Sequence, residues 1–370
     1  MGTRPNRNKF SMGGRRGLMS YVAVVALQFG FAGMYLISTF SLHRGLSHYI
    51  FVVYRHAAAT LAIAPFALLL ERKKRPKMTL AVFLRILALG LLEPVLDQNM
   101  YFLGMKYTSA SYASVAANVV PALTFVMAVI FRLERIRVRE RSSQAKVVGT
   151  VATLTGAMIM AAYKGPTVEF PWRGGVSLFH RHGGTLEPVA DQHWLAGALL
   201  LLGSTTSWSA FFILLTFTLE RYPAELSLTS LICVVGVGEG AAVALVMEKD
   251  RRAWAMGWDS RLLACVYSGF ICSGLAYYVQ GVVSRDRGPV FTTAFFPLSM
   301  IITVALGSIL LNEQIRLGSL IGAITIVLGL YSVVWGKSRE QSPSPSKSAE
   351  GSCHELPVVN SKAAPHKIGH

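Results

Sequence analysis

The sequence predicts an all-α membrane protein with ten transmembrane helices, arranged as two inverted repeats of five helices each. Three observations predict this fold: an apolar composition, ten long apolar runs, and a resemblance between the two halves of the chain. Of the 370 residues, 52% are hydrophobic and 15% are charged, whereas a typical soluble domain has about 25% charged residues. This composition excludes a disordered chain and argues against a soluble enzyme.

The apolar runs have the length of membrane-spanning helices. A helix needs about 20 mostly apolar residues to cross the hydrocarbon core of a bilayer. Runs of this kind cover roughly residues 19–38, 49–70, 83–104, 108–131, 145–163, 194–216, 228–247, 262–283, 289–311 and 317–336. We therefore expect ten spans joined by mostly short connections.

The basic residues predict the orientation of these spans. The chain carries 36 Lys and Arg against 19 Asp and Glu, which gives a net charge of +17. The two tails and alternate connections hold more than twice as many Lys and Arg as the remaining connections. Because such an excess marks cytoplasmic loops, we expect both termini in the cytoplasm. No nucleic-acid-binding motif accompanies the charge, so we expect no nucleic-acid partner.

The two halves of the chain resemble each other. The segment LERIRV (133–138) is similar to NEQIRL (312–317), and each follows a span with a central proline, Pro121 or Pro297. Each segment also precedes a span with two glycines seven residues apart, Gly149 and Gly156 in the first half and Gly322 and Gly329 in the second. A unit of five spans repeated in tandem must insert its second copy upside down, as in many secondary transporters.

This repeat divides the chain into five parts. We expect a cytoplasmic N-terminal tail over 1–18, a first five-helix repeat over 19–163, an extracytosolic linker over 164–193, a second five-helix repeat over 194–336, and a disordered cytoplasmic tail over 337–370. The last part contains SPSPSKS, a composition that is typical of disorder.

Several stretches are similar to one family of plant membrane proteins. They include LQFGFAGMYLIS (27–38), LEPVLDQNMYF (92–102) and AYYVQGVVSRDRGP (276–289). On these motifs the chain resembles nodulin-21-like, WAT1-related transporters, which are EamA-domain members of the drug/metabolite transporter superfamily. The resemblance covers about 19–336 and implies a ten-helix carrier. The EPVLDQN form is most similar to the UMAMIT branch, which implies amino acids as substrates and the plasma membrane, ahead of the vacuolar membrane, as location. A neighbouring branch transports auxin, the alternative substrate.

Charged residues within the spans are candidates for function, because a charge at the bilayer centre costs about 3 kcal/mol on insertion scales. Glu93 and Asp97 lie four residues apart in the third span, on one helical face. Pro94 should kink this span at the carbonyl of Gly90. Arg55 in the second span lies at the depth of Asp97, which predicts an Arg55–Asp97 ion pair. This pair is either a static clamp between the second and third spans, or a gating contact or site for the substrate's carboxylate.

Proton coupling and substrate contact add further candidates. Glu239 in the seventh span and Glu93 lie near midplane, and either could exchange a proton during transport. Pro121 and Pro297 should each free a backbone carbonyl inside a span. The full set of candidates along the substrate path is Gln28, Arg55, Glu93, Asp97, Gln98, Asn99, Asn118, Pro121, Trp208, Glu239, Tyr278, Gln280, Phe295, Phe296 and Pro297.

The sequence favours a carrier over the other classes of membrane protein. A lipid-modifying enzyme would need clustered His or Asp residues at one membrane face, and a channel would need a filter or polar ring. Neither pattern occurs in the sequence. We therefore expect a secondary carrier that works by alternating access and is not an enzyme. Its expected partners are the lipid bilayer, a small solute and protons as a candidate coupling ion, with no metal and no cofactor.

Overall fold

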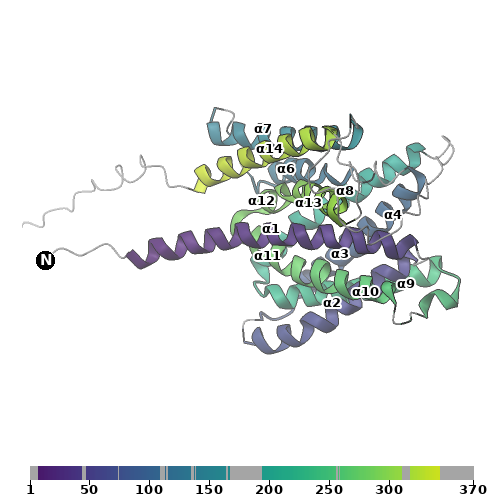
Figure 1. Cartoon of the computed structure of the whole chain (residues 1–370). Coiled ribbons are helices and arrows are strands. Elements are labelled where there is room, and N and C mark those ends of the chain that lie inside the picture. The colour runs from purple at the N-terminus through teal and green to yellow at the C-terminus, as the bar shows by residue number, and fades with distance from the viewer. Residues whose placement is uncertain are drawn as a thin grey trace, which may run out of the picture.

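The structure is a computed structural model, in which the residues described form a bundle of helices without a strand (Figure 1). The described residues are 7–43, 47–73, 75–108, 113, 116–134, 137, 139–163, 166, 194–255, 257, 259–310 and 317–341. The first half contains α1 (Arg7–His43), α2 (His48–Leu70), α3 (Leu80–Gly90), η1 (Leu91–Asp97), α4 (Gln98–Tyr107), α6 (Val120–Ile130) and α7 (Arg141–Ala162). The second contains α8 (Trp194–Arg221), α9 (Glu225–Met247), η3 (Arg251–Trp254), α10 (Ser260–Ser268), η4 (Gly269–Leu275), α11 (Ala276–Arg287), α12 (Pro289–Ala294), α13 (Phe296–Leu310) and α14 (Leu317–Gln341).

These helices confirm the all-helical membrane fold. Within the described part of the chain, seven helices are long and apolar enough to cross a membrane. The other three expected spans are helical as well: α3, η1 and α4 together cover 83–104, α6 covers part of 108–131, and α7 covers all of 145–163 but its last residue. The total of ten spans remains a prediction, because none of these three is among the seven helices that are long and apolar enough. The expected linker, except for Pro166, and most of the expected C-terminal tail lie outside the described residues.

The third span of each half contains a π-helix at a corresponding place. In η1, Pro94 has no N–H to donate and its ring collides with a carbonyl one turn earlier, so the helix widens instead of only kinking. In η4 the same widening occurs without a proline. A methyl group on Gly269 would overlap with the carbonyl oxygen of Arg55. The backbone of η4 therefore lies directly against α2.

Contacts between helices show that the two halves have opposite orientations. Along α7 and α14, Gly149 lies against Gly329, and Gly156 lies against Gly322. The residue numbers rise along one helix as they fall along the other, so the two helices are antiparallel. A methyl group on Gly149 would lie 2.6 Å from the carbonyl oxygen of Gly329. The glycine pairs that revealed the repeat thus lie in the most extensive contact between two helices of the described residues, and α7 and α14 lie side by side in Figure 1.

The second and seventh spans are related in the same way. Gly236 of α9 lies against His56 of α2, and Gly240 lies against Val52, so α2 and α9 are antiparallel. Inverted repeats predict opposite directions for equivalent helices. The expected inversion is therefore confirmed by two pairs of equivalent spans.

Two prolines take a different position from the one expected. Pro121 lies at the start of α6, and Pro297 lies at the start of α13, directly after α12. The first turn of a helix needs no donor from the proline nitrogen. The expectation that each proline frees a carbonyl inside a continuous helix is therefore wrong, because each one begins a new helix.

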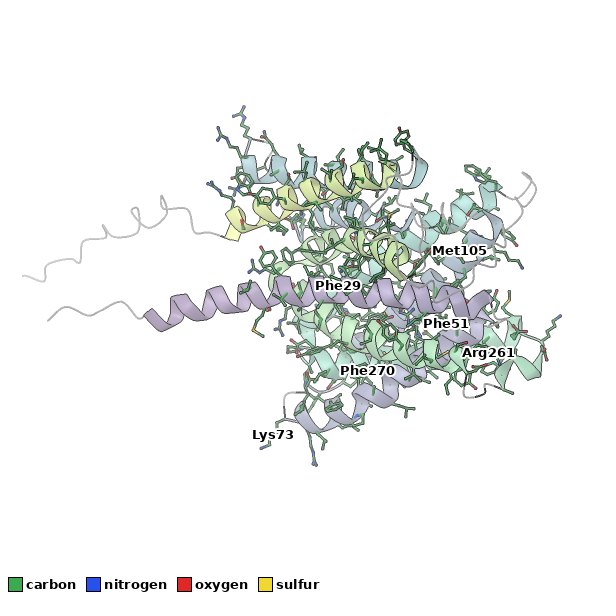
Figure 2. The ribbon with its side chains drawn as sticks, in the orientation of Figure 1. Phe29, Phe51, Lys73, Met105, Arg261 and Phe270 are labelled. Atoms are coloured by element: carbon green, nitrogen blue, oxygen red, sulfur yellow. The ribbon has the colours of Figure 1, made fainter. Side chains whose placement is uncertain are left out.

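Large apolar side chains cover the outside of the bundle. Phe29 and Phe270 are labelled in Figure 2 and are about half exposed, at 56% and 49%. Such exposure fits contact with lipid, since monomeric soluble proteins rarely expose large apolar patches. The polar side chains Lys73 and Arg261 lie at opposite ends of the bundle in the same figure. Between these ends the interior packs Phe211, Phe212 and Ile232 from α8 and α9.

Candidate functional site

A group of buried charged side chains lies where α2, η1, η4 and α11 meet. Arg55 and His56 come from α2, and Glu93 comes from η1, all with exposures of 4% or less. The Arg55 Nε donates a hydrogen bond of 2.7 Å to the hydroxyl of Ser273 in η4. Arg55 Nη2 lies 3.8 Å from Glu93 Oε1. We call Arg55, His56, Glu93, Ser273 and Tyr277 the central cluster.

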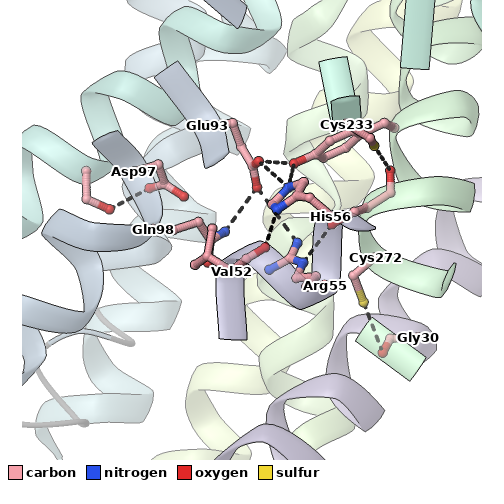
Figure 3. Close-up of polar contacts among 12 residues, drawn as sticks. Gly30, Val52, Arg55, His56, Glu93, Asp97, Gln98, Cys233 and Cys272 are labelled. Carbon is pink, nitrogen blue, oxygen red and sulfur yellow. Dashed lines mark hydrogen bonds and ion pairs between the residues drawn. The ribbon is translucent and has the colours of Figure 1, made fainter. Parts of the chain in front are cut away.

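Glu93 has the largest number of polar contacts in the central cluster. The hydroxyl of Tyr277 donates a hydrogen bond to Glu93 Oε2, and the amide of Gln98 donates one of 3.0 Å to Oε1. His56 Nε2 lies 3.7 Å from the same carboxylate and 3.4 Å from the Tyr277 hydroxyl. Its other nitrogen, Nδ1, lies 2.7 Å from the carbonyl oxygen of Val52. Figure 3 shows these interactions converging on Glu93.

Asp97 does not pair with Arg55, so the expected ion pair is wrong. Its Oδ1 accepts a hydrogen bond of 2.5 Å from the hydroxyl of Ser204 in α8, and the ion-pair partner of Arg55 is Glu93. Equal depth pointed to Asp97, but depth says nothing about the direction in which a side chain points. Widening of η1 and the contact between η1 and α8 direct Asp97 away from α2, as Figure 3 shows.

Three amide candidates, Gln28, Asn99 and Asn118, form hydrogen bonds outside the central cluster. Asn99 donates to the carbonyl oxygen of Val95, and Gln28 donates to that of Val24. The oxygen of each amide is buried without a hydrogen-bond partner among the described residues. Asn118 donates to the sulfur of Met300. These three side chains therefore lie inside the bundle, as expected, but outside the central cluster.

Glu239 lies apart from the other charges. Its side chain is half-buried, and Oε2 is buried without a hydrogen-bond partner in the described part of the chain. A methyl group on Gly90 would lie 2.9 Å from this oxygen. Glu239 of α9 therefore packs directly on the third span, just before η1.

The aromatic candidates pack mainly on one another. The rings of Trp208 and Phe296 stack with centroids 4.7 Å apart. Phe295 belongs to a different apolar group, with Phe291 and Val24. Pro297 and Gln280 are buried, and Tyr278 is half-buried. Of the four aromatic candidates, only Trp208 and Phe296 therefore pack against each other in the described part of the chain.

Four members of this region were absent from the sequence-based candidates: His56, Ser204, Ser273 and Tyr277. His56 follows Arg55 directly in an apolar run, and that was a usable signal. Buried Ser and Tyr are common in helices, so nothing in the sequence distinguishes Ser204, Ser273 or Tyr277 from packing residues. Three of the four come from the second repeat, which makes the region a junction between the repeats.

A second group of buried charges lies at one end of the α7–α14 pair. Glu134 accepts hydrogen bonds from Lys146 of α7, at 2.6 Å, and from Lys337 of α14. Burial acts to raise the pKa of the Glu134 carboxyl, but the two ammonium groups outweigh it and hold the pKa below its usual value. We call these three residues the terminal clamp. No group of three metal-binding side chains occurs among the residues described.

Comparisons with known proteins give the family. The sequence profile of the EamA-like transporter family matches residues 18–162 and 195–335. Two WAT1-related proteins of Arabidopsis thaliana are 54% and 53% identical over 353 and 343 residues, which cover 93% of this chain in each case and 90% and 91% of theirs. A third is 52% identical and covers 92% of this chain and 91% of its own.

A solved crystal structure supports the fold independently. It is similar with a TM-score of 0.62 at 17% identity, over 84% of this chain and 98% of its own. At this identity the likeness extends to the fold alone. Together with the apolar helices and the inverted repeat, the comparisons place the chain in the EamA-like transporter family, as an integral, multi-pass membrane transporter similar to WAT1-related proteins.

Proposed function

We propose that the chain is a secondary carrier that moves amino acids across the membrane by alternating access between its two repeats. The observation that carries this proposal is the central cluster, whose side chains come from both repeats and are buried in apolar helices. Movement of one repeat against the other would change these contacts. An inverted-repeat carrier binds its substrate at such an interface, near midplane.

The charges of the central cluster favour a zwitterion. Arg55 has five N–H groups; the described residues engage Nε by a hydrogen bond and approach Nη2 only at 3.8 Å. A substrate carboxylate could bind the guanidinium, and the substrate ammonium could then bind Glu93. Every charge would keep a partner. An auxin-like anion, the alternative substrate, would bind Arg55 but leave Glu93 uncompensated, and an uncompensated buried charge is costly.

The test is exchange of labelled solutes in proteoliposomes that contain the full-length protein. We expect exchange of a labelled neutral amino acid, and at least tenfold less exchange of labelled indole acetate. Arg55→Gln should abolish exchange. The control is Arg85→Gln, because Arg85 also lies in a span but donates to the backbone carbonyl of Phe217. Indole acetate exchanging faster than any amino acid would refute the zwitterion argument.

Orientation and location form part of the same proposal. We place both termini in the cytoplasm, the 164–193 linker on the other side, and the protein in the plasma membrane, in line with the distribution of basic residues. A glycosylation reporter inserted in the linker should be modified, and one fused after His370 should not. A tagged full-length protein should lie at the cell surface rather than on the vacuole. The opposite reporter pattern would contradict the orientation.

A further inference from the structure

The two carboxylates of η1 have different surroundings, although they lie four residues apart and are both buried. Glu93 is approached by Tyr277, Gln98, Arg55 and His56. Among the described residues, Asp97 has one side-chain partner, the hydroxyl of Ser204. No Lys, Arg or His of the described residues lies within 4.0 Å of the Asp97 carboxylate.

The number of charges indicates that one proton is bound in this region. The permanent cation is Arg55, and two carboxylates share it. A buried carboxylate without a cation costs several kcal/mol, so the second carboxylate requires a positive charge. A metal ion has no suitable group of ligands in the described part of the chain. A proton meets the requirement without further ligands.

The hydrogen-bond partners indicate which carboxylate holds this proton. Arg55 and the Gln98 amide nitrogen can only donate, so they suit an ionised Glu93. The Ser204 hydroxyl can donate to an ionised Asp97 or accept from a protonated one. A proton can therefore leave or join Asp97 without leaving an unpaired group. From these two observations we infer that Asp97 binds and releases the proton that couples transport to a pH gradient.

His56 is the competing site for the proton. Its Nδ1 contacts the carbonyl oxygen of Val52 at 2.7 Å, which commits that nitrogen to donation. A proton on Nε2 would face Glu93 at 3.7 Å, beyond hydrogen-bond distance. It would also give Glu93 two cations and leave Asp97 with none. A proton on Asp97 compensates both carboxylates where they lie.

Other titratable groups around Asp97 do not change the balance of one permanent cation, Arg55, for two carboxylates. The elements packed against η1, or bonded to it, contribute Arg55 and His56 from α2, Tyr101 from α4, Cys233 and Glu239 from α9, and Tyr277 from α11. Tyr and Cys are neutral unless they lose a proton, and Glu239 lies against Gly90, on the other side of Pro94. Because Ser204 belongs to the second repeat, loss of the proton would place a charge directly at the contact between the repeats.

The inference rests on the proposed carrier function, and its test separates the two. Wild type, Asp97→Asn and the control Asp259→Asn are reconstituted as full-length proteins. Asp259 is the exposed cap of α10, where Asn also caps. We expect Asp97→Asn to exchange substrate but to lose accumulation driven by a pH gradient, down to the level without a gradient. Absence of exchange in wild type would refute the carrier function, not the proton site.

Two further measurements decide whether Asp97 or His56 binds the proton. Infrared spectra of substrate-free protein at neutral pH should lose one protonated carboxyl band in Asp97→Asn and keep it in Asp259→Asn, and this readout needs no transport. Ser204→Ala should shift the midpoint of the pH dependence of uptake, which covers the case in which Asp97→Asn does not fold. Loss of gradient-driven accumulation in His56→Asn, with Asp97→Asn normal, would overturn the assignment, as would an unchanged infrared band.

Discussion

The central cluster and the terminal clamp are both buried ionic groups that join the two repeats, yet they are built differently. In the terminal clamp, two ammonium groups donate to one carboxylate, and Lys146 and Glu134 are 2.6 Å apart. In the central cluster one guanidinium lies 3.8 Å from its carboxylate. Each of the two groups has a neutral partner, because Arg55 donates to the hydroxyl of Ser273 and Glu93 accepts from the amide of Gln98. The clamp therefore has two cations for one carboxylate, whereas the central cluster and the neighbouring Asp97 have two carboxylates for one permanent cation, Arg55.

This difference separates a structural ion group from a functional one. Short hydrogen bonds to charged partners are strong and fix their geometry, and the clamp lies at the end of the close α7–α14 contact. The longer Arg55–Glu93 pair, which is also bonded to the hydroxyl groups of Ser273 and Tyr277, can exchange partners at a lower free-energy cost than the clamp. We therefore expect changes in the clamp to reduce stability, and changes in the centre to reduce transport. Four predictions test this comparison.

The largest effect is expected from Glu134→Ala. This change leaves the ammonium groups of Lys146 and Lys337 buried beside each other, and breaking a buried ion pair costs about 3–5 kcal/mol. Thermal unfolding in detergent and the amount of protein in the membrane measure the loss. The control Arg137→Ala removes an exposed pair with Glu140, which should cost about 0–1 kcal/mol. Equal stability of the two variants would contradict a structural role for the clamp.

Gly149→Ala should have the next largest effect. The added methyl group would lie 2.6 Å from the backbone of α14, so the helices must separate, at a cost of about 1–3 kcal/mol. In Gly238→Ala the added group meets nothing within 4 Å, and stability should change by less than about 0.5 kcal/mol. The measurement is thermal unfolding of both variants. A Gly149→Ala protein as stable as Gly238→Ala would disprove the close α7–α14 contact.

Arg55→Lys should affect transport rather than stability. The charge is kept, but an ammonium cannot reproduce the planar set of donors that reaches Ser273 and Glu93 together. We expect a loss of about tenfold in transport rate per protein, equivalent to about 1.4 kcal/mol, with a normal amount of protein. Arg85→Lys serves as the control, with transport close to wild type. Normal transport by Arg55→Lys would remove the case for Arg55 as the substrate's carboxylate site.

The smallest effect is a dependence of stability on pH through Glu134. Its pKa is lower in the folded protein than the ordinary value of 4.5, so pairing adds stability above that value. The contribution is lost as the pH falls through the folded pKa. The difference in unfolding temperature between wild type and Glu134→Gln should therefore be constant near neutral pH and shrink below about pH 4.5. A difference independent of pH would mean that the carboxylate does not pair with the lysines.

The sequence alone determined the membrane fold and its internal symmetry. A backbone in lipid must satisfy its hydrogen bonds internally, and apolar runs of about 20 residues have the length at which a helix does so across a bilayer. The glycines at spacing seven in both halves also predicted the repeat, and they proved to form a helix contact because a small residue is required wherever two backbones approach closely. The sequence also identified three buried charges, Glu93, Asp97 and Arg55, because each of them lies within a long apolar run.

Only the tertiary structure decided which of these groups meet. Depth along a helix gives the level of a side chain but not its direction, so depth pointed to Asp97 as the partner of Arg55, whereas Arg55 pairs with Glu93. The π-helix of η1 turns Glu93 towards Arg55 and Asp97 towards Ser204. Contacts with Ser273 and Tyr277 depend on the packing of the second repeat against the first. Their partners lie more than 180 residues away in the chain, and no local pattern encodes a contact at that separation.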